Sequence, residues 1–130
     1  MCIRDSPGYA GWQRDLSISW DRLGDVRVAQ GDLPGALQAF TEQKNIADQL
    51  ATADPGNAQW QRDLVVSYVK LAETAAAGPR PASAATHYRE ALHVARDLAA
   101  SGRLAPADAR MVEALEQRLA ATPTAPDPPP

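Results

Sequence analysis

The chain has few of the residues from which metal and redox sites are built: one cysteine and two histidines among 130 residues. A single Cys2 cannot form an internal disulfide, and it leaves a thiolate metal site short of ligands. No apolar run approaches the roughly 18 residues that cross a bilayer. The N-terminal segment also lacks the charged, apolar and small-residue zones of a signal peptide. We therefore expect a soluble, cytoplasmic protein.

An excess of basic residues is also missing. The formal charge is −3 and the isoelectric point is about 5.3, so nothing offsets the charge of a phosphate backbone or an acidic membrane. We expect no nucleic-acid partner and no membrane partner. With 45% hydrophobic residues, a chain of this length can bury one modest core or stack a few repeat units.

We do not expect the first six residues to belong to the fold. Met1–Ser6 (MCIRDS) resembles the translation of a transposon-end adapter used in preparing sequencing libraries. We expect this segment, residues 1–6, to be a non-native scar, so that the natural protein continues upstream of Pro7 and the chain is a C-terminal fragment. The alternative is an ordinary disordered N-terminus.

An internal repeat organises the rest of the chain. Residues 12–16 (WQRDL) recur as residues 60–64, a shift of 48 positions. The same shift places Leu23 on Leu71, Ala36 on Ala84 and Phe40 on Tyr88 without a gap. A fainter third copy begins at Pro106. We predict two repeat units, residues 7–53 and 54–101, and a degenerate capping half-repeat, residues 102–121.

Each unit is predicted to contain two helices, because its apolar residues recur every three or four positions. Gly31 should end the first helix and Asp32 should cap the second, which runs to about Ala53. Asn57 should cap the third helix. The later helices are expected at Ala58–Ala77, Ala82–Ser101 and Pro106–Ala121, with Gly102 closing the fourth. Residues 122–130 contain five prolines and should be disordered.

No segment alternates with the two-residue period of a strand, so the predicted fold class is all-α. About five helices should pack as tandem antiparallel pairs, stacked as an α-solenoid. A long antiparallel bundle is the rival arrangement. Stacking is favoured because repeated units bury their apolar faces most simply against their neighbours.

The repeat resembles the tetratricopeptide (TPR) family. Trp20-x2-Leu23-Gly24 and Ala36-x3-Phe40 match that family's pattern, at the expected distance between the two halves. The second unit repeats them as Tyr68-x2-Leu71-Ala72 and Ala84-x3-Tyr88. Small residues at these positions let paired helices approach closely, with Gly24 facing Ala36 and Ala72 facing Ala84.

The resemblance has departures. Arg27 and Ala75 replace the pattern's tyrosine, the closing proline is missing, and the period is 48 residues instead of 34. The chain is therefore similar to an extended bacterial variant of the family. The resemblance implies a protein-binding scaffold with no catalytic site and no cofactor.

Direct inspection identifies no catalytic or metal site either. His87 and His93 are six positions apart on one predicted helix, too far round it to share a face. The carboxylates Asp15, Asp63 and Glu90 could be considered as acid–base groups. However, Arg-Asp recurs with the repeat at 14–15 and 62–63, which indicates structural ion pairs. We predict that the chain is not an enzyme.

The resemblance implies a concave groove lined by the first helix of each unit. The groove residues would be Ile18, Asp21, Asp25, Val28, Val66, Val69, Glu73 and Ala76. Three of these are acidic and none is basic, which predicts a basic peptide or helix as partner and binding that weakens with salt. The alternative is that these positions are merely solvated helix faces.

The leading functional hypothesis is a protein–protein interaction scaffold within a longer bacterial regulatory protein. The alternatives are an accessory region of an enzyme whose catalytic domain lies upstream, and an array that assembles with copies of itself through an exposed first helix. Trp12 and Leu16 should be exposed if upstream repeats that cover them are missing, whereas Trp60 and Leu64 should be covered. We expect Leu23 and Leu71 to be buried in the core, and Arg22 and Lys70 to face solvent.

Overall fold

The computed structural model describes residues 7–78 and 82–122, and the side chains from residue 11 onward. Within these ranges the fold is all-α, as predicted. Five α-helices follow one another: α1 (Pro7–Ala29), α2 (Leu33–Ala53), α3 (Ala58–Ala76), α4 (Ser83–Ala100) and α5 (Met111–Ala121). A 3-10 turn, η2 (Pro106–Asp108), precedes α5.

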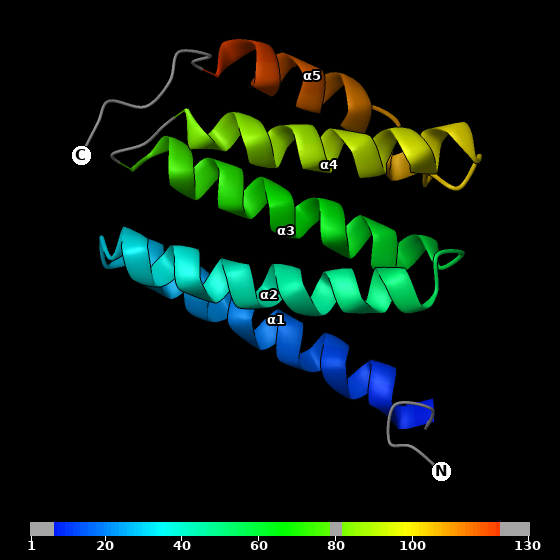
Figure 1. Ribbon diagram of the computed structural model, residues 1–130, viewed down its shortest axis with the longest axis horizontal. Coiled ribbons are helices and arrows are strands. Elements are labelled where there is room, and N and C mark those ends of the chain that lie inside the picture. Colours follow the sequence, from blue (N-terminus) through cyan, green and yellow to red (C-terminus); the bar gives the residue numbers. More distant parts are fainter. Residues whose placement is uncertain (1–6, 79–81, 123–130) are drawn as a thin grey trace.

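The helices are layered in chain order. Each packs on the next, with α1 against α2, α2 against α3, α3 against α4 and α4 against α5. Figure 1 shows α1 at one edge of this stack and α5 at the other. Consequently α2, α3 and α4 each lie between two neighbours, while α1 and α5 each have an outer side.

The predicted helix ends are confirmed where glycine or a capping side chain defines them. Gly31 has φ +78° and Gly102 has φ +70°, the left-handed conformation that glycine adopts without a Cβ penalty. Asp32 Oδ1 accepts a hydrogen bond from the Gly35 amide at 3.0 Å. Asn57 Oδ1 accepts one from the Trp60 amide at 3.1 Å. These side chains satisfy amides that have no partner inside the helix.

Small residues bring the helices of each unit together, as the motif predicts. Ala72, Ala84 and Tyr88 share one buried cluster that joins α3, α4 and α5. In the first unit, buried Gly24 packs directly on the ring of Phe40. Phe40 also lies with Leu71 in a second cluster, which connects α2 to α3. The repeated small-plus-aromatic pattern is therefore a packing device within and between units.

The repeated arginines form ion pairs, but not with the adjacent aspartates. Arg14 of α1 reaches Asp63 of α3, with Nε to Oδ2 at 2.9 Å. Arg62 of α3 reaches Asp108 of η2 at 2.7 Å. Each arginine thus bonds a carboxylate about one unit further along the chain, and the hydrogen bond to that carboxylate raises the arginine pKa. The recurring dipeptide links successive units.

The prediction of one continuous fifth helix is wrong. The chain forms the 3-10 turn η2, and α5 begins only at Met111. The turn is closed by the Asp108 amide, which donates to the Ala105 carbonyl at 2.8 Å. It holds Asp108 where Arg62 binds it bidentately, so a tertiary ion pair overrides local helix propensity.

The structure also differs from the predictions at Thr122, Leu23 and Lys70. Thr122, expected in the tail, caps α5 and donates its hydroxyl to the Arg118 carbonyl at 2.8 Å. Residues 1–6, 79–81 and 123–130 lie outside the described part of the chain. With them lie the predicted scar, most of the connection between the third and fourth predicted helices, and the rest of the tail. Leu71 is buried as expected, but Leu23 is only half-buried. Lys70 does not face solvent: it is half-buried and ion-paired.

Candidate binding groove

The predicted groove residues of the first unit lie on one side of α1. Ile18 and Asp21 are half-buried, and Asp25 and Val28 are exposed. The carboxylates of Asp21 and Asp25 face Lys70 of α3, whose Nζ lies 3.7 Å from Asp21 Oδ1 and 2.8 Å from Asp25 Oδ1. The structure therefore brings both acids together around a cation.

Lys70 changes the expected charge of the groove. The groove residues predicted from the sequence include three acids and no base. In the structure, Lys70 lies beside two of these acids and 5.7 Å from the centre of the Phe40 ring. Burial opposes its charge, but the hydrogen bond from its ammonium to Asp25 and the field of Asp21, Asp25 and Glu73 outweigh burial, so its pKa is raised. The ammonium therefore stays charged and offsets the acids.

A pocket of about 360 Å³ opens between α3 and α5. Three of the four groove residues predicted in the second unit, Val66, Val69 and Glu73, line it, whereas Ala76 is exposed and outside it. Its lining is completed by two further α3 residues and by residues of η2, of α5 and of the junction between them. These are Val65, Lys70, Ala107, Asp108, Arg110, Met111, Ala114, Leu115 and Arg118.

The floor of the pocket is apolar and its rim is charged. Val65 and Leu115 are buried beneath it, and Val69 and Met111 are partly buried against the same cluster. Rim charges are largely paired: Arg118 lies 3.6 Å from Glu73, and Asp108 is held by Arg62. The volume falls at the lower end of ligand-sized pockets, roughly 300–1,000 Å³. The site suits an apolar side chain more than a charged one.

Sequence reasoning missed the α5 side of this pocket. It took groove positions only from the two complete units and treated the third copy as a cap. The 48-residue shift that relates Ile18 to Val66 also relates Val66 to Ala114, and Ala114 does line the pocket. Extending the repeat one step further would have found it.

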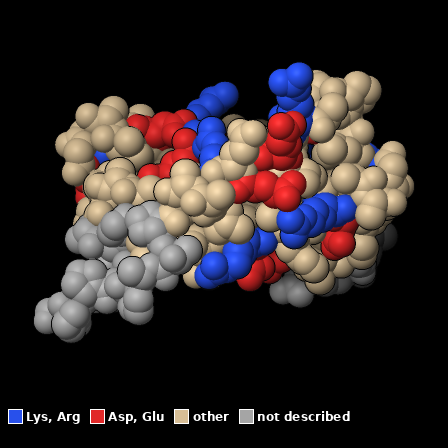
Figure 2. Space-filling model, turned by 90° about the horizontal axis from the view of Figure 1, so that it is seen from above, with Lys and Arg blue, Asp and Glu red and all other residues tan. Residues whose placement is uncertain are grey.

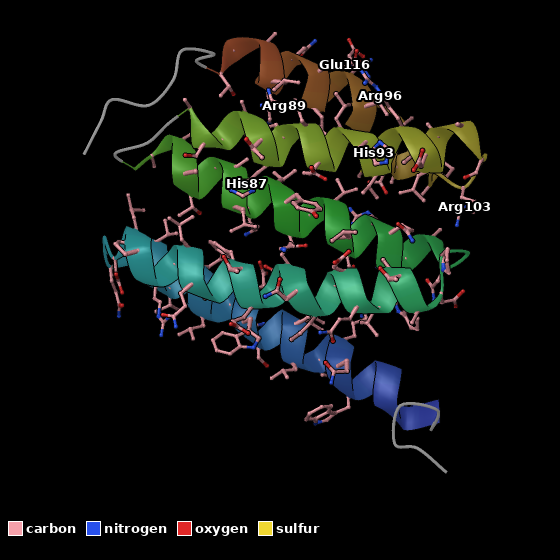
Figure 3. All side chains as sticks on the ribbon, viewed as in Figure 1. His87, Arg89, His93, Arg96, Arg103 and Glu116 are labelled. Carbon is pink, nitrogen blue, oxygen red and sulfur yellow. The ribbon has the colours of Figure 1, made fainter. Side chains whose placement is uncertain are left out.

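Charges on the face nearest α5 are mixed. Figure 2, viewed from the α5 side of the stack, shows acidic and basic side chains interspersed rather than gathered by sign. One such pair joins Arg96 of α4 to Glu116 of α5 at 3.3 Å (Figure 3). The visible face therefore carries no broad field that would steer a strongly charged partner.

The two histidines lie apart on α4 (Figure 3). His93 Nε2 is 3.7 Å from Asp97 Oδ2, and His87 lies near Lys44 and Glu90. Among residues 11–78 and 82–122, no three His, Cys, Asp or Glu side chains converge as metal ligands would. Within these described residues, no helix is long and apolar enough to cross a membrane.

We predict that His87 makes the fold less stable below pH 6.5. Burial, and secondarily the charge of Lys44, lower its pKa from the ordinary 6.5. The unfolded chain then binds this proton more readily than the folded one. Stability should be complete above pH 6.5 and fall as the pH drops through the lowered native pKa. Urea midpoints of the wild type should fall relative to His87→Gln below pH 6.5.

His93→Gln removes an exposed histidine from the same helix and controls for the substitution itself. A constant difference between the wild-type and His87→Gln midpoints across pH 6.5 would contradict the prediction.

Comparison of the chain with protein-family models, curated protein sequences and solved structures gives no match.

Proposed function

We propose that this chain is a helical-repeat scaffold of the tetratricopeptide type, which binds a segment of another protein along the groove formed by α1, α3 and α5. The observation that carries the proposal is the pocket between α3 and α5. It has an apolar floor, a rim of paired charges and a volume of about 360 Å³. Three of the groove residues that the resemblance to the tetratricopeptide family implies, Val66, Val69 and Glu73, line it.

The chemistry of the pocket favours an apolar anchor on the partner. Inserting a large apolar side chain removes its surface and that of Val69 and Met111 from water, a gain of about 25 cal/mol per Å² of apolar surface. Extended and helical peptides are commonly held in this way, by one or two anchors in a preformed groove. We propose a peptide or partner helix with one such anchor.

The partner need not be basic. Asp21 and Asp25 are offset by Lys70, and the rim of the pocket includes Arg110 and Arg118 beside the acids. A basic partner would gain little from acids that are already paired. Binding dominated by the apolar anchor should change little between low and physiological salt, in contrast to the expectation from the acids alone.

The test is selection of peptides from a displayed random library on the wild-type chain, followed by affinity measurement on Ala114→Glu. Ala114 is exposed at the pocket, so glutamate there obstructs the site without entering the core. Selected peptides should share a large apolar residue and bind the variant at least about tenfold more weakly, the equivalent of about 1.4 kcal/mol.

Ala120→Glu is the matched control, because Ala120 is exposed on the same helix and does not line the pocket. Peptides should bind it as they bind the wild type. If no peptide is enriched, or if the enriched peptides bind Ala114→Glu with wild-type affinity, the groove is not the binding site.

A further inference from the structure

A second apolar surface, separate from the groove, runs along the outer side of α1. It consists of residues spaced alternately four and three apart, here called the α1 stripe: Trp12, Leu16, Ser19, Leu23 and Val26. Trp12 is 60% exposed, Val26 51% and Leu16 36%. Alternating four-three spacing is the seam pattern by which two helices pair.

The second unit shows that this pattern is an interface. The 48-residue shift carries the α1 stripe onto α3 at Trp60, Leu64, Ser67, Leu71 and Thr74. There α2 covers it: Leu64 packs on Ala47 and Ala51, and Leu64, Ser67 and Leu71 are 5%, 0% and 3% exposed. Leu16 is more exposed than Leu64, and Trp12 is more exposed than half-buried Trp60, as predicted.

The α1 stripe is accessible to another helix. Ser17 and Gly24, the buried positions of α1, lie about 130° round the helix from the middle of the stripe at 100° per residue. Figure 1 shows α1 at the edge of the stack, with α2 on one side only. A helix could therefore pack on the α1 stripe without displacing α2.

Two opposite charges flank the stripe in a self-complementary way. Asp15 precedes Leu16, and Arg22 precedes Leu23, so both lie along the same edge of the seam. Both side chains are exposed, and neither forms an ion pair with another described residue. In an antiparallel pair of identical helices, such positions face each other across the interface.

We propose that the chain forms a twofold dimer through antiparallel pairing of α1 with α1 of a second copy. In this register Trp12 lies opposite Leu23 of the partner subunit, and Leu16 lies opposite the partner's Ser19. Asp15 then faces the partner's Arg22, and symmetry forms this pair twice, as in any isologous interface. The twofold axis crosses the seam midway between Leu16 and Ser19.

The side-chain sizes favour this register over a parallel pair. Antiparallel pairing places each large residue opposite a smaller one, which keeps the distance between the helices even. Parallel pairing would place Trp12 against the partner's Trp12 and leave a gap between the two Ser19 side chains. It would also lose the contact between Asp15 and Arg22.

A second copy of the chain is the favoured partner for the α1 stripe, because the stripe lies at an edge of the stack in every copy. Helices α2, α3 and α4 each pack between two neighbours, so α1 and α5 form the two edges of the stack. The exposed residues of α5 are mostly polar, including Glu113, Glu116 and Gln117. Of these two edge helices, only α1 presents an apolar seam with complementary charges among its described side chains. The seam is short, so a reversible, concentration-dependent dimer is expected.

The test is sedimentation equilibrium of the full chain under reducing conditions, so that Cys2 cannot cross-link copies. The wild type should dimerise as concentration rises. Asp15→Arg and Arg22→Asp each place like charges across the seam at two symmetric sites. Each should raise the dissociation constant by about ten- to a hundredfold, and Leu16→Glu should abolish the dimer.

Mixing the Asp15→Arg chain with the Arg22→Asp chain should restore dimers, because opposite charges then meet at both sites only in the mixed pair. Glu42→Arg, at an exposed position of α2, is the matched control and should dimerise like the wild type. Circular dichroism checks that every variant keeps its helices.

A chain that stays monomeric at all concentrations would overturn the proposal and would indicate that a different helix covers α1. Dimers that the two charge reversals do not weaken, or that mixing does not restore, would overturn the antiparallel register. Ala114→Glu lies in the groove and should leave the dimer intact. A negative result in the dimer test would therefore leave the groove proposal, on which the dimer does not depend, unaffected.

Discussion

Replacing Leu71 with alanine is expected to lower the free energy of unfolding by about 2–5 kcal/mol, the range for truncating a buried leucine. Leu71 is 3% exposed and lies with Ala36 and Phe40 in the cluster that joins α2 to α3. The cavity left by alanine would therefore weaken the contact between the two repeat units. Urea denaturation followed by circular dichroism measures the loss.

Two variants of the first helix calibrate this result. Leu23 occupies the same repeat position but is only half-buried, so Leu23→Ala should cost about 1 kcal/mol. Arg22→Ala, at an exposed position, should stay within about 0.5 kcal/mol of the wild type. Equal losses for Leu71→Ala and Arg22→Ala would show that the assignment of helix faces is wrong.

The ends of the helices could be predicted from the sequence because the residues that set them act on their near neighbours in the chain. Gly31, Asp32 and Asn57 each act on residues within one turn, and their roles in ending or capping helices are confirmed. The 48-residue shift predicted two similar helical pairs. Spacing also predicted the buried face of α3, where Leu64 and Leu71 are covered. The matching face of α1 is largely exposed at Trp12, Leu16 and Val26, because its burial depends on what lies beyond α1.

Contacts between units were harder to predict because their partners are far apart in sequence. Lys70 and Asp25 are separated by 45 positions, and nothing near Lys70 indicates that it will cross from α3 to α1. The Arg-Asp dipeptide was correctly interpreted as structural. Its true partners, one unit further along, could be known only once the units were placed side by side.

The same limit applies to the candidate site. The groove positions on α3 were predicted from the resemblance to the tetratricopeptide family, and three of the four line the pocket. The other wall comes from a third copy whose sequence has drifted and whose first turn became η2. Its position depends on the bond between Arg62 and Asp108, which couples the wall of the pocket to the link between units.

Gly24→Ala is expected to destabilise the fold by about 1–2 kcal/mol, against the usual effect of this change within a helix. Alanine is favoured over glycine in a helix by about 1 kcal/mol. At Gly24, however, a Cβ would lie less than 3.0 Å from three carbons of the Phe40 ring. That ring is 1% exposed and packed into the cluster that joins α2 to α3, so we expect overpacking, typically about 1–3 kcal/mol, to outweigh the gain.

Gly11→Ala is the matched control in the same helix, because a Cβ at Gly11 meets nothing within 4 Å. It should stabilise α1 by about 0.5–1 kcal/mol. Opposite signs for the two changes, measured as shifts in the urea midpoint, would show that close approach of α1 to α2 requires glycine at position 24. A stabilising Gly24→Ala would mean that the ring of Phe40 can move aside, and that the motif's small residue does not set the distance between these helices.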